Sequence, residues 1–126
     1  MNKIIFHEFD PVIYPLKLWV VKNPTNEVIK ERFIHYDGEK IEDDFRKISA
    51  AAVYNTVLLN VETDNFGILV SIKNGLTVKY TAHEATHAAR FMWDWLRERE
   101  PAIEADAYLV GWIAECIWQV KTGKFK

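Results

Sequence analysis

Five consecutive residues of the chain include side chains whose types and spacing would allow metal binding and catalysis. They are His83, Glu84, Ala85, Thr86 and His87, which form the pattern H-E-x-x-H. On an α-helix, residues four apart lie on the same face, so both histidines can direct a ring nitrogen at one point. Zinc accepts neutral imidazole in tetrahedral geometry at about 2.0–2.1 Å. The spacing therefore predicts one zinc ion per chain, with His83 and His87 as ligands.

Glu84 is placed to act on a water molecule bound to such a metal. Each helical residue turns by about 100°, so the carboxylate lies beside the metal rather than on it. Zinc lowers the pKa of its bound water toward about 7, and a nearby carboxylate can then accept the proton. These residues predict Glu84 as a general base. The alternative is that both histidines are ordinary helix residues and that no metal binds.

A catalytic zinc site usually has three protein ligands, so a third donor is needed. A histidine six residues after His87 is excluded, because that position is Trp93. The other source is a carboxylate from a following helix. Glu104 and Asp106 are about 200° apart on a helical wheel, so only one of them can face the metal. The carboxylates available in this segment are Glu104, Asp106 and Glu115.

The rest of the chain must position these side chains, and its pattern changes from strand-like to helical after Gly75. Strands are predicted at 16–21, 52–61 and 66–72, the last two paired as a hairpin. Helices are predicted at 26–34 behind Thr25, at 82–96 entered through Thr77 or Thr81, and at 103–120. This order predicts an α+β fold. A small antiparallel or mixed β-sheet in the N-terminal half would pack on two C-terminal helices, the first carrying HExxH and the second the third metal ligand.

Length and composition indicate one domain over 1–126 and exclude several partner classes. The 126 residues are 49% hydrophobic, with 16 basic and 18 acidic side chains and a net charge of −2. This balance indicates no nucleic acid and no membrane as partners.

Cys116 is the single cysteine, and the N-terminus lacks the apolar run of a signal peptide, so we expect a cytoplasmic protein. An exposed Trp93 or Trp95 would suit a homodimer contact.

Two segments of the sequence resemble a known group of enzymes. "HEATHAARF" followed by "EADAYLVGWI" is similar to the gluzincin type of zinc metallopeptidase. The similarity is greatest to small single-domain metallopeptidases of bacteriophages and bacterial mobile elements, and it covers about residues 77–118. The resemblance implies that His83, His87 and Glu104 bind zinc and that Glu84 is the base. Tyr108 stands where larger gluzincins often have an aspartate, and it would accept a hydrogen bond from a ring N–H of a histidine ligand.

The geometry of two successive helices restricts how Glu104 could reach the metal. A first helix that ran to Glu98 would carry the chain about 16 Å past His87. We therefore predict that this helix ends within 93–96, with a break before Pro101, and that Asp106 points away from it. Candidates for a group that polarises the substrate carbonyl are His35, Tyr36, Tyr80 and Arg90.

The sequence thus predicts zinc-dependent hydrolysis of peptide bonds, by an endopeptidase rather than an exopeptidase. Its substrate would be a peptide or protein, which could add in extended form beside an edge strand, with 66–72 as the candidate. The alternative function is a zinc-binding but catalytically inactive phage-type protein that acts as a binding module.

Overall fold

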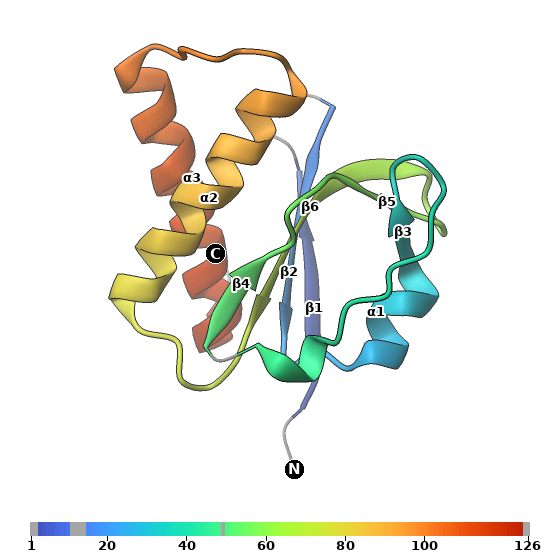
Figure 1. Cartoon of the computed structure of the whole chain (residues 1–126). Helices are drawn as coiled ribbons and strands as arrows, with labels where there is room; N and C mark the ends of the chain where they lie inside the picture. Colours follow the sequence, from blue (N-terminus) through green and yellow to red (C-terminus); the bar gives the residue numbers. More distant parts are fainter. Residues whose placement is uncertain (1–2, 11–14, 49, 125–126) are drawn as a thin grey trace.

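The structure is a computed structural model that describes residues 3–10, 15–48 and 50–124. The N-terminal half contains a mixed β-sheet and the C-terminal part contains two long helices (Figure 1), which confirms the predicted α+β fold. In chain order the elements are β1 (Ile5–Phe9), β2 (Lys17–Lys22), α1 (Asn26–Arg32), β3 (Phe33–His35), a 3-10 turn η1 (Phe45–Lys47), β4 (Ala51–Val53), β5 (Leu58–Asn60), β6 (Asn65–Ile72), α2 (Val78–Trp95) and α3 (Ile103–Thr122).

Strand β6 is the centre of the sheet. It pairs with β2 in parallel on one side and with β4 and β5, both antiparallel, on the other. The β4 pairing uses the end of β6 at Val70–Ile72, whereas β5 pairs with its beginning at Asn65–Gly67. Strand β1 extends the sheet beyond β2, and β3 extends it beyond β5. Within the described residues β4 pairs with β6 alone, so its other side is open.

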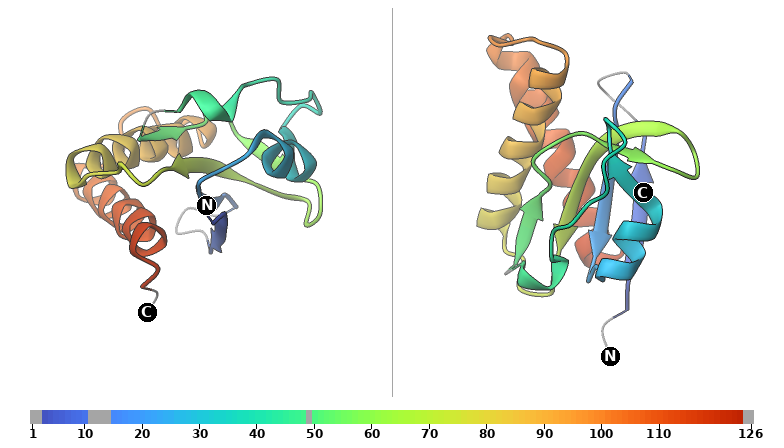
Figure 2. Two further views of the ribbon diagram at one scale, coloured as in Figure 1. Left: turned by 90° about the horizontal axis from the view of Figure 1, so that it is seen from below. Right: turned by 45° about the vertical axis from the view of Figure 1, so that its right-hand side comes forward.

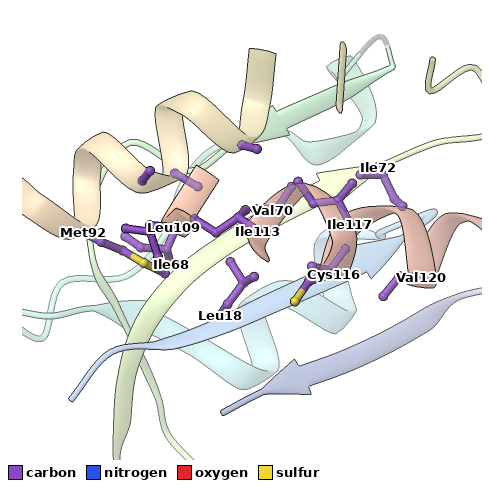
Figure 3. Packing of buried hydrophobic residues seen from close by; sticks show 14 of the residues in the cluster. Leu18, Ile68, Val70, Ile72, Met92, Leu109, Ile113, Cys116, Ile117 and Val120 are labelled. Carbon is purple, nitrogen blue, oxygen red and sulfur yellow. The ribbon is translucent and has the colours of Figure 1, made fainter. Parts of the chain in front are cut away.

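The sheet is the middle of three layers. Helices α2 and α3 cover one face, and α1 with the segment that follows β3 covers the other (Figures 1 and 2). Figure 3 shows side chains of β2, β6, α2 and α3 pointing into a common core, among them Leu18, Ile68, Met92, Leu109 and Ile113. All five are at most 1% exposed. This apolar contact fixes α2, the helix with the two histidines, on the sheet.

The two long helices occupy the predicted segments with small differences at their ends. Thr77 caps α2, because its hydroxyl accepts a hydrogen bond from the backbone N–H of Tyr80. The helix ends at Trp95, inside the predicted window, and α3 begins at Ile103 after the predicted break. Ala85, Ala88 and Ala89 are fully buried, so α2 approaches its neighbours closely.

Several predictions for the N-terminal half need correction. The predicted strand 52–61 is two strands, β4 and β5, and only β5 forms the predicted hairpin with β6. The predicted helix 26–34 ends at Arg32, where the chain turns into β3. The prediction that 66–72 is an edge strand is wrong, because β6 has neighbours on both sides.

Gly67 in β6 allows the Trp19 side chain of β2 to be fully buried. A Cβ atom at position 67 would lie 2.5 Å from the backbone oxygen of Lys17 and 2.9 Å from two ring carbons of Trp19. Trp19 is 0% exposed, and its Nε1–H donates to a carboxylate oxygen of Glu8 at 2.8 Å. Glycine is therefore required here by space.

We expect Gly67→Ala to lower the free energy of unfolding by about 3 kcal/mol, the upper part of the range for overpacked sites. The Lys17 backbone oxygen that it would meet cannot move aside as a flexible side chain can. Urea unfolding followed by circular dichroism measures the loss. Gly75→Ala is the matched control, because a Cβ at Gly75 meets nothing within 4 Å. Equal unfolding midpoints for the two variants would contradict the prediction.

Candidate metal centre

His83 and His87 lie one turn apart on the exposed face of α2. Their Nε2 atoms are 3.1 Å apart, in a hydrogen bond between the two rings, so the two ring nitrogens meet at one place on the helix surface. Two nitrogens bound to one tetrahedral zinc at 2.0–2.1 Å would be about 3.3 Å apart. The pair therefore has nearly the separation that two zinc ligands need. The His83 side chain is 62% exposed, so this point is open to solvent.

The Glu84 carboxylate lies beside this point. Its Oε2 atom is 4.0 Å from Nε2 of His83, and the side chain is only 13% exposed. Together with His83, Ala50, Ala51 and Tyr80 it lines a cavity of about 270 Å³. A water molecule on a metal held by the two histidines would therefore be within reach of a carboxylate oxygen.

The open side of β4 borders the same cavity. Lys73 donates its backbone N–H to the Ala50 carbonyl at 2.9 Å, and Tyr54 donates to the Leu69 carbonyl at 2.9 Å. Residues of an antiparallel strand alternate in direction, so Ala50, Ala52 and Tyr54 bond to β6. The backbone N–H and C=O groups of Ala51 and Val53 consequently point to the open side. The edge next to the HExxH helix is thus β4, and it replaces the predicted 66–72.

The structure does not bring the third predicted ligand to the histidines. Glu104 is exposed in the first turn of α3, and among the described residues no three His, Cys, Asp or Glu side chains are grouped to hold a metal. Asp106, predicted to point away from α2, instead accepts a hydrogen bond of 2.9 Å from Nε1–H of Trp93. The predicted rotation of the second helix is therefore wrong.

The rotation of α3 follows from its apolar residues. The buried side chains of the helix are Leu109, Ile113, Cys116, Ile117 and Val120. This spacing defines one face, and Glu104 lies on the opposite one. Tyr108, on the same side as Glu104, is 76% exposed and has no hydrogen bond to either histidine in the described part of the chain.

Cys116, the remaining soft donor on α3, is not available as a metal ligand. Burial raises the pKa of its thiol to about 12, and the neighbouring Glu115 carboxylate contributes to this shift. Cys116 is also only 3% exposed and lies in the core that α3 forms with the sheet, away from the exposed histidines. The two imidazoles fit a zinc ion, and the described residues in this arrangement supply no third ligand.

Of the four candidates for polarising a substrate carbonyl, the structure places Tyr80 in the cavity next to Glu84. His35 instead contacts the Tyr54 hydroxyl at 3.0 Å, and Tyr36 packs against Trp95. Arg90 is exposed and does not line the cavity. Sequence reasoning missed Lys79, which also lines this cavity. Its position four residues before His83 was a usable signal, whereas no sequence pattern marks Ala50 and Ala51.

The chain matches no protein-family model, and comparisons with curated proteins and with solved structures also find no match. Among the described residues, no helix combines the length and the apolar character that crossing a bilayer requires.

Proposed function

We propose that this protein is a zinc-dependent peptidase that cleaves within a peptide chain. The main support is the convergence of the His83 and His87 Nε2 atoms, 3.1 Å apart, with a carboxylate oxygen of Glu84 4.0 Å from His83. The two proposed ligands and the proposed base thus lie close together in the described structure. The resemblance to gluzincin-type metallopeptidases over residues 77–118 supports the same function.

Each side chain of the centre has one task in this proposal. Zinc bound by the histidines would supply a water molecule whose pKa is lowered toward about 7. Glu84 would accept a proton from that water, so that the water oxygen could bond to the carbonyl carbon of the substrate. When the C–N bond breaks, Glu84 passes the proton to the departing amine nitrogen. The proton is therefore returned and the carboxylate is ready for another cycle.

The open side of β4 is the proposed site for the substrate backbone. An extended peptide can bond to the free N–H and C=O groups of Ala51 and Val53 and so add a strand to the sheet. That strand would lie beside Glu84 and His83, because Ala51 lines the same cavity as these two side chains. The site is open, so a peptide could continue past it in both directions, which favours an endopeptidase.

Glu104 remains the third ligand that the resemblance implies, as a prediction. To reach the metal, the first turn of α3 would have to leave its present exposed position. This disagreement favours a second candidate function, in which the protein binds zinc and a peptide partner but cleaves nothing. A peptide that binds the zinc-loaded protein and is recovered intact would support that second function.

The test is hydrolysis of a mixture of unfolded peptides before and after metal removal. Untreated protein should cut peptides at interior bonds, as read by mass spectrometry. Chelation should abolish this cleavage, and adding zinc back should restore it, because the water depends on the metal for its lowered pKa. Cleavage that persists at full rate in metal-free protein would refute the proposal.

A further inference from the structure

Helix α3 has a second face with a regular residue pattern, on the side opposite its buried face. Six residues on it are spaced alternately three and four apart, so they form one stripe of the kind that packs in a coiled coil. None of the six is buried. We call this set the outer stripe, and its members are Glu104, Ala107, Gly111, Ala114, Trp118 and Lys121.

The fold of the single chain accounts for only part of the apolar side of this stripe, since Ala114 packs partly against the core. Trp118 is 38% exposed, and the adjacent Ile103 is 85% exposed. A Cβ atom at Gly111 would meet nothing within 4 Å, so no neighbour in the described chain requires a glycine there. Glycine in a helix costs about 1 kcal/mol relative to alanine. A helix that is apolar on both sides is normally covered on both.

We propose that the outer stripe binds the same stripe of a second copy of this chain, with the two α3 helices antiparallel. One register matches every member of the stripe. Gly111 lies against Ala114 of the partner subunit, Trp118 against Ala107 of the partner subunit, and Glu104 against Lys121 of the partner subunit. The three pairs are centred on one point of the helix, between Trp112 and Ile113, so a single two-fold axis produces all of them.

The pairs are complementary in size and in charge. Gly111 and Ala114 are small, so the helix axes can approach closely at the centre of the contact. The large Trp118 ring meets the small Ala107 on each side of the centre. Glu104 and Lys121 form an opposite-charge pair at each end, where water still reaches them.

The parallel arrangement lacks this complementarity. In a parallel dimer each residue of the stripe would face the same residue of the other subunit. Glu104 would face Glu104 of the partner subunit, Lys121 would face Lys121 of the partner subunit, and the two Trp118 rings would meet. Like charges at the same level repel, so the charges of the stripe select the antiparallel orientation. Antiparallel helix dipoles add a favourable contribution.

The contact between the two α3 helices buries little surface, so the dimer should be weak. A 20-residue helix is about 30 Å long, so one helix from each subunit covers less than the roughly 800 Å² per partner of a standard interface. The dimer should therefore dissociate on dilution. Sedimentation equilibrium of the full chain over a wide concentration range should show a reversible change from monomer to dimer.

Gly111→Arg is the principal variant. Its side chain projects into open space in the monomer, so the variant should fold, and circular dichroism checks this. Between the two helices the same side chain prevents close approach, so Gly111→Arg should stay monomeric at every concentration. Val78→Arg is the matched control, because Val78 is 71% exposed but lies on α2, and it should dimerise like the wild type.

Charge exchange tests the register. Lys121→Glu places two glutamates together at each end of the contact and should weaken dimerisation at least tenfold. The double variant Glu104→Lys with Lys121→Glu recreates both opposite-charge pairs and should restore it. A wild type that is monomeric throughout, a Val78→Arg variant as weak as Gly111→Arg, or a double variant that stays monomeric would each overturn the proposal. Zinc uptake can be measured on the same samples, and Gly111→Arg and Lys121→Glu should leave it unchanged, because both variants keep the predicted ligand Glu104.

Discussion

Replacing Glu84 by glutamine should lower kcat/KM for peptide hydrolysis by about 10²–10⁴-fold, the usual contribution of a general base. Glutamine keeps the size of the side chain and its hydrogen-bonding capacity, but it cannot accept the proton of the metal-bound water. Zinc content should hardly change, because the proposed ligands are His83 and His87. The measurement is the steady-state rate on a peptide cut by the wild type, with zinc determined on the same samples.

Glu31→Gln is a matched control for this substitution, since Glu31 is an exposed glutamate on the separate helix α1. It should leave both the rate and the zinc content unchanged. If Glu84→Gln cleaves the peptide at the wild-type rate, Glu84 is not the base. If it loses zinc together with activity, the carboxylate is a ligand.

His83→Ala should abolish stoichiometric zinc binding, with a loss of affinity of more than about 100-fold. Removing groups that only support a ligand already costs about 10–100-fold, and removing a ligand itself should cost more. The 3.1 Å separation of the Nε2 atoms is the basis for this expectation. Titration of metal-free protein with zinc, in competition with a chromogenic chelator, measures the affinity.

His35→Ala is the control for the loss of a histidine as such. Its ring contacts Tyr54 on the face of the sheet away from α2, so zinc affinity should not change. Unchanged zinc binding in His83→Ala would eliminate the metal centre and the proposed function with it.

The same titration of Glu104→Ala and Asp106→Ala decides the third ligand, and the resemblance implies that only Glu104→Ala should weaken zinc binding.

The elements that were predicted well from the sequence are those whose limits are marked by several neighbouring residues. The polar residues at 97–100 before Pro101 marked the end of α2, and the apolar segment that follows Pro101 marked α3. Thr77 was one of two caps considered, and its hydroxyl is the one that closes the first turn of α2. Strand β2 was also predicted, because a run of strand-forming residues ends at Asn23 and Pro24.

Strand order was not predictable, because it depends on contacts between distant segments. Nothing within 66–72 shows that β6 would have β2 on one side and β4 and β5 on the other. The open edge beside the histidines was for that reason assigned to the wrong strand. The three-residue strand β4 is too short to stand out from its surroundings in the sequence.

The error in the rotation of α3 has a different cause. The choice between Glu104 and Asp106 was made from the needs of a metal, although the apolar side chains determine which face of a helix is buried. Leu109, Ile113 and Ile117 turn Asp106 toward α2, where Trp93 donates to it, and they turn Glu104 outward. Weighing the apolar pattern first would have predicted this orientation.

The parallel pairing of β2 with β6 has a consequence for the newly made chain. Lys17 pairs with Gly67, and α1, β3, β4 and β5 all lie between them in the sequence. At a synthesis rate of 5–20 residues per second, the ribosome needs roughly 3–10 s to make the intervening 50 residues (67 − 17 = 50). During that time Leu18, Val20 and the other apolar residues of β2 have no partner in β6. Strand β2, whose four central residues are buried in the folded protein, thus waits a long time for its central neighbour, and it is the segment where we expect a nascent-chain chaperone to bind.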